Sequence, residues 1–179
     1  MFDLDSFTAD CVAALNESQP RTAIKEVLAR ALADPEAVAR ALPATRAEIE
    51  RIHVDPDLTI IKVVWAPGMR IFPHDHRMWA CIGIYGGQED NTFYRRSPDG
   101  VVESGGTTLL ERDVTLLGDD TIHAVHNPRD RYTGAIHIYG GDFFTQPRSQ
   151  FDPDTLAEGP YDVEGTVALF EQANAAAER

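Results

Sequence analysis

The sequence is short of cysteine, of basic residues and of long apolar runs. Its two cysteines, Cys11 and Cys81, are too few and too far apart to form a disulfide framework. No window reaches the roughly 18 consecutive apolar residues of a membrane-spanning helix. The first residues are acidic where a signal peptide would carry positive charge. We therefore expect a soluble, cytoplasmic protein.

The shortage of basic residues restricts the partners that the chain can bind. It has 16 Lys and Arg residues against 29 Asp and Glu, and a formal net charge of −13. Such a surface does not neutralise phosphates, so neither nucleic acid nor an anionic membrane is an expected partner. A length of 179 residues is that of one domain with a full apolar core.

Residues 3–42 show the apolar spacing of helices. Ser18 with Pro20 predicts the start of a second helix, and Asp34 with Pro35 predicts the start of a third. The predicted buried stripes are Phe7, Cys11, Ala14 and Leu15, followed by Ile24, Val27, Leu28, Ala31 and Leu32. These helices have no spacing typical of metal ligands or nucleophiles, so we interpret them as packing elements.

From about Glu48 the pattern changes to short β-branched and aromatic runs between turn signals. Strands without intervening helices indicate an antiparallel sandwich or barrel. After Gly140 the chain is predicted to be irregular, until a last helix at 163–176 with Val167, Phe170 and Ala173 on its packed side. Strands are expected near 50–54, 58–65, 70–74, 78–86, 90–97, 100–104, 107–111, 113–117, 122–127 and 132–140, with turns at 97–100 and 104–106.

His74 and His76 are two residues apart in a strand-like run. Side chains at that spacing lie on one face of a strand, so the two imidazoles could share a metal ion, while Asp75 faces the other side. A His-x-His pair alone is a weak signal. A second histidine cluster, GDDTIHAVHNP, follows later and contains His123.

This order resembles the two motifs of the cupin superfamily, in which a Gly-led His-x-His is followed by a Gly-led single His and an Asn. Gly118, His123 and Asn127 match the second motif. The resemblance implies a mainly β fold, the double-stranded β-helix or jelly-roll barrel, with a metal held by His74, His76 and His123. The single cupin domain would span 1–179, with a helical extension at 1–47, the barrel at 48–145, and a C-terminal tail and helix at 146–179.

Many cupins add a glutamate shortly after the His-x-His pair, but Ala80 to Gly83 offer none. Glu89 is expected to face solvent or to brace a turn. Three neutral histidines leave both charges of a divalent metal uncompensated, which favours an anionic ligand such as a thiolate or an enolate. Fe(II) would keep three open positions and zinc usually one, so the residues alone do not name the metal.

The stretch GAIHIYGGDF resembles the His-x-Tyr strand of thiol dioxygenases of the cysteine dioxygenase type. His137 and Tyr139 match it, and Ala135 replaces the usual serine. The resemblance implies Fe(II) as the cofactor, although Ni or Zn could be bound as purified. It also implies O₂ and a small thiol as substrates, a sulfinate as the product, and catalytic roles for Tyr139 and His137.

The resemblance assigns further positions near the substrate. Cys81 stands where some relatives carry a cysteine linked through sulfur to the tyrosine, although a buried free thiol is the simpler interpretation. Arg51 best matches the arginine that binds a substrate carboxylate, with Arg70 and Arg77 as rivals. His53 and His126, the two remaining histidines, are interpreted as structural.

The sequence is also compatible with two other functions. A three-histidine cupin could cleave a carbon–carbon bond of a β-diketone, which the apolar Met78, Trp79, Phe93 and Phe143 would suit. A cupin that binds a metal or small ligand without catalysis is the other, although the sequence has no helix-turn-helix pattern of a regulator. The fold also allows a homodimer, formed through a sheet edge, an extra strand or the C-terminal helix.

Overall fold

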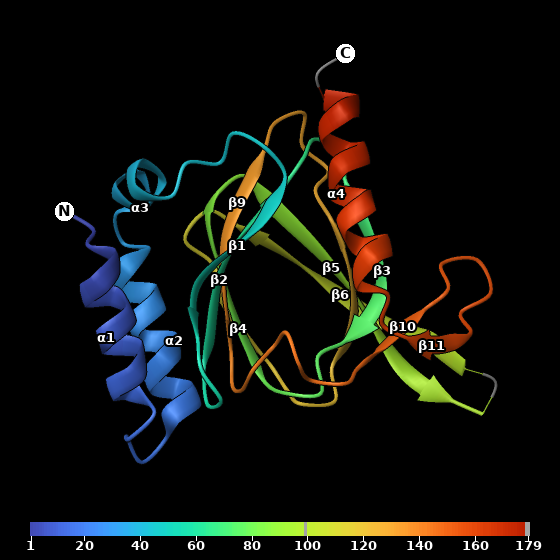
Figure 1. Ribbon diagram of the computed structural model, residues 1–179, viewed down its shortest axis with the longest axis horizontal. Helices are drawn as coiled ribbons and strands as arrows, with labels where there is room; N and C mark the ends of the chain where they lie inside the picture. The colour runs from blue at the N-terminus through green and yellow to red at the C-terminus, as the bar shows by residue number, and fades with distance from the viewer. Residues whose placement is uncertain (99, 178–179) are drawn as a thin grey trace.

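The computed structural model describes residues 1–98 and 100–177 (Figure 1). Asp99 of the predicted turn at 97–100, and the last two residues of the predicted C-terminal segment, lie outside this part. Two antiparallel sheets face each other as a barrel, with three N-terminal helices against one side and the last helix beside β3. Among the described residues, no helix has the length and apolarity to cross a membrane.

The N-terminal helices begin where the sequence predicts them. They are α1 (Leu4–Ala14), α2 (Pro20–Ala31) and α3 (Pro35–Ala41). Asp34 caps α3, because its side chain accepts a hydrogen bond from the backbone N–H of Ala37 at 3.0 Å. The predicted cap at Ser18 is wrong: Gln19 is the N-cap of α2, and the fixed φ of Pro20 begins the helix.

The strands follow the β-branched runs closely. The five-stranded sheet has the order β1-β2-β9-β4-β7, and the six-stranded sheet has the order β11-β10-β3-β8-β5-β6. The strands are β1 (Glu48–Val54), β2 (Thr59–Trp65), β3 (Arg70–Asp75), β4 (Ala80–Gly86), β5 (Gln88–Ser97), β6 (Gly100–Leu110), β7 (Val114–Leu117), β8 (Ile122–His126), β9 (Thr133–Tyr139), β10 (Ser149–Phe151) and β11 (Glu158–Pro160). The last helix is α4 (Val163–Ala177).

The strand pairs are nested. The innermost pair is β5 with β6, and outside it β4 pairs with β7, β3 with β8, and β2 with β9. Such nesting is a long hairpin wound on itself, which is the jelly roll predicted from the sequence. The barrel interior is therefore lined by alternate residues of strands that lie far apart in the chain.

The helices α1 to α3 cover the outer face of the five-stranded sheet. Leu28 of α2, Ile60 of β2 and Ile138 of β9 belong to one fully buried cluster between the helices and the sheet. At Gly83 a Cβ would lie 2.6 Å from Cδ1 of Leu32, so only glycine lets α2 approach β4 this closely. Every residue of β2 and β9 is buried, including Lys62 of β2 and His137 of β9.

Three further predictions of local structure are wrong. The turn at 104–106 lies inside β6, where Gly105 has φ 143° and takes part in a bulge opposite Phe93. The segment after Gly140 is not irregular throughout, since it forms β10 and β11. Val167 of α4 is 53% exposed, whereas Phe170 packs on Trp65 with ring centroids 5.5 Å apart.

Candidate metal centre

Three histidines meet inside the barrel near one of its ends. His74 is the last but one residue of β3 and lies directly opposite His123 of β8, and His76 directly follows the strand. The Nε2 atoms of His76 and His74 are 3.2 Å apart, and those of His123 and His76 are 3.3 Å apart. All three side chains are buried, and together they form a group that could hold a metal ion.

A bulge in β3 places these ligands. The register shifts between Ile71 and His74, so that both residues face the interior although they are three apart. Asp75 then points outward, as predicted, and accepts hydrogen bonds from the Ser149 backbone N–H at 2.7 Å and from Arg96 at 3.1 Å. The buried Asp75 thus fixes the backbone between the two histidines from the outside.

The spacing of the three ring nitrogens fits a divalent transition metal. At a metal–nitrogen distance of about 2.1 Å, two ligand nitrogens lie about 3.0 Å apart at a right angle and about 3.4 Å apart in a tetrahedron. Burial lowers the pKa of His74 to about 4 and lowers the pKa values of His76 and His123 well below the usual histidine value. The rings are therefore neutral, as metal ligation requires.

Outer hydrogen bonds orient two of the ligands. The Phe72 carbonyl can only accept, so His74 donates its Nδ1–H to it at 3.0 Å. Asn91 donates through Nδ2 to Glu89, which leaves its Oδ1 to accept Nδ1–H of His123 at 2.6 Å. Both bonds leave the Nε2 lone pair free for a metal. Nδ1 of His76 has no hydrogen-bond partner among the described residues.

The opposite sheet contributes His137 and Tyr139 of β9 to the same interior. Nδ1 of His137 is 3.1 Å from the Tyr139 hydroxyl, and the Tyr139 ring centroid is 5.0 Å from that of His76. Burial raises the pKa of Tyr139, so the phenol keeps its proton. The Tyr139 ring stacks on Phe143 with centroids 4.2 Å apart, which fixes its direction.

Glu89 does not face solvent, contrary to the prediction from its position beside a turn. It is 0% exposed and lies inside the barrel, outside the three-histidine group. Trp65 Nε1 donates to it at 2.7 Å and Asn91 Nδ2 at 3.0 Å, while His137 Nε2 lies 3.4 Å away. Burial raises the pKa of Glu89, but the contacts with His137, Asn91 and Trp65 outweigh it and hold that pKa below its usual value.

Cys81 lies on the other side of the sheet from Tyr139. It is the cross-strand partner of Ile138, so its side chain joins Ile138 in the cluster under the N-terminal helices, whereas Tyr139 faces the interior. A thioether between Cys81 and Tyr139 is therefore ruled out, and so is a substrate contact of this thiol. Burial raises the pKa of Cys81 to about 12, as expected of an inert buried thiol.

The predicted arginines do not reach the cavity. Arg70 is exposed on the outer face of β3 beside His126. Arg77 is paired with Asp75 at 2.6 Å, and Arg51 lies exposed over the Phe144 ring, 3.8 Å from its centroid. The structural interpretation of the other histidines agrees with His126 on the outer face and with His53 bonded to Asp55 at 2.6 Å.

Arg148 is the residue that the sequence did not reveal. Its guanidinium carbon lies 4.0 Å from the ring centroid of Phe143 and 4.1 Å from that of Tyr161. Its Nε is buried and has no partner among the described residues. The segment was predicted to be irregular, so no strand parity could indicate where this side chain points.

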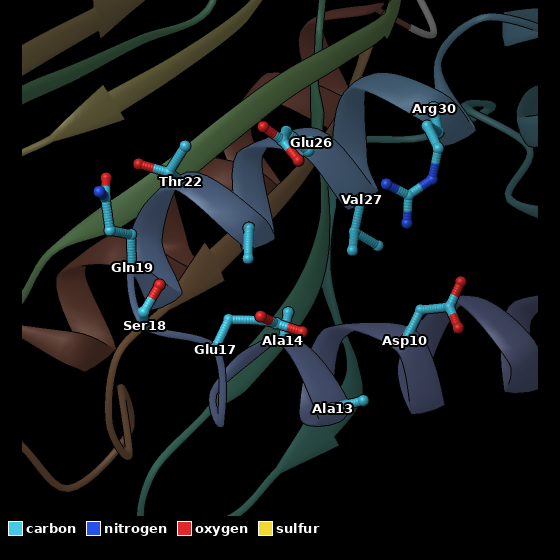
Figure 2. Close-up of a pocket in the computed structure, with 11 residues that line it drawn as sticks. Asp10, Ala13, Ala14, Glu17, Ser18, Gln19, Thr22, Glu26, Val27 and Arg30 are labelled. Carbon is cyan, nitrogen blue, oxygen red and sulfur yellow. The ribbon is translucent and has the colours of Figure 1, made fainter.

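The cavity at the histidines is small. Its volume of about 20 Å³ is room for about one water molecule. Aliphatic side chains of β2 and β3 line one part of it, and Phe143 and Tyr161 of the C-terminal segment line another. A larger hollow of about 570 Å³ lies far from the site, as an open polar groove between α1 and α2 (Figure 2).

The comparisons with known proteins agree with the topology. The chain is similar to a solved protein from Bacillus halodurans, with a TM-score of 0.51 and 15% identity over 58% of this chain and 77% of that one. The fold is the double-stranded β-helix. At this identity the likeness shows the fold and not the activity.

Weaker matches include a cupin-family protein with a double-stranded β-helix fold from Methanocaldococcus jannaschii (TM-score 0.48, 11% identity, 57% of this chain and 86% of that one). Another is a cupin 2 conserved barrel domain protein from Salinispora arenicola (TM-score 0.43, 18% identity, 52% and 74%). No protein-family model matches the chain. Within this double-stranded β-helix, the three-histidine group could bind a metal of unspecified identity.

Proposed function

We propose that this protein is a cupin-superfamily, mononuclear non-haem iron dioxygenase that oxidises a small thiol to a sulfinate with O₂. One observation carries the proposal: a carboxylate-free set of three histidine Nε2 atoms faces a buried His137–Tyr139 pair across one small cavity. A bound Fe(II) would supply the redox chemistry between the thiolate and O₂. His74, His76 and His123 would hold it.

The chain's own residues prepare the cavity for an anionic sulfur. Three neutral imidazoles leave the charge of a divalent ion uncompensated, which favours a thiolate over a neutral thiol. The Tyr139 hydroxyl is placed to hydrogen-bond the substrate beside that ion. Phe143 and Tyr161 line the cavity, and they must shift to admit a substrate, because its volume of about 20 Å³ is room for about one water.

Arg148 takes the role that the sequence assigned to Arg51 or Arg70. Its Nε is buried and unpaired among the described residues, and both aromatic rings that sandwich its guanidinium line the cavity. A guanidinium held in this way suits a carboxylate. We therefore infer a substrate with a thiol at one end and a carboxylate at the other.

The carbon–carbon cleaving alternative has one specific observation in its favour. The cavity lining is rich in aliphatic side chains, such as Ile61, Val63 and Val125, which suit a β-diketone. Of the apolar residues named for this purpose, however, only Phe143 lines the cavity, and Trp79 packs with the N-terminal helices instead. Arg148 favours the thiol acid, because its Nε has no partner among the described residues although its Nη1 donates to the Phe143 carbonyl.

The test is oxygen uptake by Fe(II)-reconstituted protein with 3-mercaptopropionate, cysteine, cysteamine and acetylacetone in turn. We expect uptake with a thiol that carries a carboxylate. Arg148→Gln should raise the KM for that thiol by about 10–100-fold, the value of a hydrogen bond to a charged group, and should leave cysteamine unaffected. Uptake with acetylacetone alone would replace the proposal, and tight metal binding without uptake would favour the non-enzymatic cupin.

A further inference from the structure

The carboxylate of Glu89 inside the barrel contacts two groups of residues in the candidate site. Oε1 of Glu89 accepts from Asn91, which in turn holds the metal ligand His123. Oε2 accepts from Trp65 at 2.7 Å and lies 3.4 Å from Nε2 of His137. Glu89 therefore connects a metal ligand of the six-stranded sheet with the His137–Tyr139 pair of the five-stranded sheet.

A fully buried carboxylate is costly unless its neighbours compensate it. Trp65 and Asn91 supply two hydrogen bonds, but neither carries a charge. The remaining polar atom facing the carboxylate is Nε2 of His137, which is within ion-pair distance yet too poorly aligned for a hydrogen bond. Only an Nε2 that carries a proton can sit favourably against this carboxylate.

The position of that proton determines the other side of the ring. With the only ring proton on Nε2, Nδ1 of His137 has a lone pair and accepts a hydrogen bond from the Tyr139 hydroxyl at 3.1 Å. The oxygen of Tyr139 then presents its own lone pairs to the cavity. Ala135 stands two residues before His137 on β9 and has no polar group, so Glu89 is the side chain that orients this ring.

We propose, resting on the thiol dioxygenase function above, that Glu89 is a positioning residue that makes the Tyr139–His137 pair the acceptor of the substrate's thiol proton. The thiol S–H bond breaks and its proton goes to the Tyr139 oxygen, while the Tyr139 proton passes to Nδ1 of His137. No electrons are transferred in this step. The imidazolium that forms is stabilised by Glu89, as an acid stabilises the histidine of a catalytic triad.

The small cavity gives such an acceptor a role. Binding as a thiolate releases one proton per substrate, and a space of about 20 Å³ holds too little water, about one molecule, to carry it away. The three metal-binding histidines cannot take it either, because their Nε2 lone pairs face the metal. Tyr139 and His137 form a hydrogen-bonded pair that can take the proton, and the Glu89 carboxylate lies 3.4 Å beyond that pair.

The first experiment reads the His137 ring directly and does not depend on activity. The protein is labelled with ¹⁵N-histidine and loaded with zinc, which is diamagnetic and so does not broaden the NMR signals. Long-range ¹H–¹⁵N NMR spectra of the ring nitrogens then show which nitrogen of each histidine carries the proton. We expect His137 to carry its proton on Nε2, in the wild type and equally in Asp90→Asn. Asp90 is the matched control because it is the adjacent carboxylate on β5, bonded to Gln88 and Thr108 instead. A proton on Nδ1 in the wild type overturns the proposal.

The second experiment separates a proton-transfer role from a structural one. Glu89→Gln should lower kcat for the thiol by about a hundredfold or more, the usual contribution of a general base. The loss should shrink as pH approaches the thiol's own pKa of about 8.5, because the substrate then arrives as a thiolate. The double variant with Tyr139→Phe should be no slower than Tyr139→Phe alone. A loss of kcat in Glu89→Gln that does not change with pH, and that adds to the loss caused by Tyr139→Phe, contradicts the proposal.

The two experiments distinguish failure of this inference from failure of the proposed function. If no thiol consumes O₂ while His137 is protonated on Nε2, the dioxygenase proposal fails and the orienting contact of Glu89 stands. If a thiol is oxidised while His137 carries its proton on Nδ1, the function stands and the role of Glu89 is overturned.

Discussion

The two sheets of the barrel differ in what lies outside them. The five-stranded sheet is covered by α1 to α3, so its central strands are buried on both faces. The outer face of the six-stranded sheet carries ion pairs instead, with Asp75, Arg77, Arg96 and Glu158 joined across β3, β5 and β11. That sheet, together with the residue that follows β3, nevertheless supplies all three candidate metal-binding histidines.

The two sheets therefore contribute differently to the stability of the protein and to its candidate metal site. Apolar burial between sheet and helices stabilises the protein without touching the site, whereas the sheet that holds the metal ligands contributes less apolar burial on its outer face. The His137–Tyr139 pair stands on the firmly packed sheet and faces the ligands of the other. We expect substitutions on the two sheets to change different measurable quantities.

The largest effect is expected from His76→Ala in the interior. Metal affinity should fall by more than the roughly 10–100-fold that loss of an outer partner costs. The free energy of unfolding of the metal-free protein should change little, because the substitution also removes the buried Nδ1 of His76, which has no hydrogen-bond partner among the described residues. Zinc should therefore raise the melting temperature of the wild type and of His53→Ala, a histidine outside the site, but not that of His76→Ala. If zinc still raised the melting temperature of His76→Ala, the assignment of His76 as a metal ligand would be contradicted.

The next effect should come from Leu28→Ala in the covering layer. Leu28 is 0% exposed between α2 and the five-stranded sheet, so truncation should lower the free energy of unfolding by about 2–5 kcal/mol. Zinc affinity should stay unchanged. Urea denaturation of the metal-free protein measures the loss, with the exposed Val12→Ala on α1 as the control. A parallel drop in zinc affinity would show that the two sheets are not separable.

The smallest effect is expected from Arg96→Gln on the outer face of the six-stranded sheet. Arg96 pairs with Asp75 and Glu158, but its side chain is 45% exposed, so its loss should cost at most about 1 kcal/mol. Screening at about 1 M salt should remove the difference between variant and wild type. Melting temperatures across a salt series measure it, and Arg40→Gln on α3 controls for an exposed helix pair. A difference in melting temperature that persists at high salt would indicate that the ion pairs of Arg96 are shielded from solvent.

The sequence predicted the fold and the three candidate metal-binding histidines because both depend on local patterns. The i, i+2 spacing placed His74 and His76 on one face and Asp75 on the other, and turn signals bounded most strands. The spacing could not show which face Cys81 occupies, because β4 is apolar on both sides. Alternation carries information only where one face of a strand is polar.

Glu89 was misjudged and Arg148 was missed for a different reason. Both are polar residues whose burial depends on which strands close the barrel, and no local spacing records that. Glu89 is buried because Trp65 and His137 approach it from the other sheet. Arg148 lies between two aromatic rings because β10 carries the chain back across β3. Such placements follow from tertiary structure alone.

The nested pairing of strands also dictates an order of events during folding. The innermost hairpin, β5 with β6, closes a short loop, while each pair outside it must close a longer one at a greater entropic cost. His74 and His123 belong to the third pair from the centre, so they meet only after much of the barrel has formed. We therefore expect the metal ion to enter a nearly folded chain, and to slow unfolding far more than it accelerates folding.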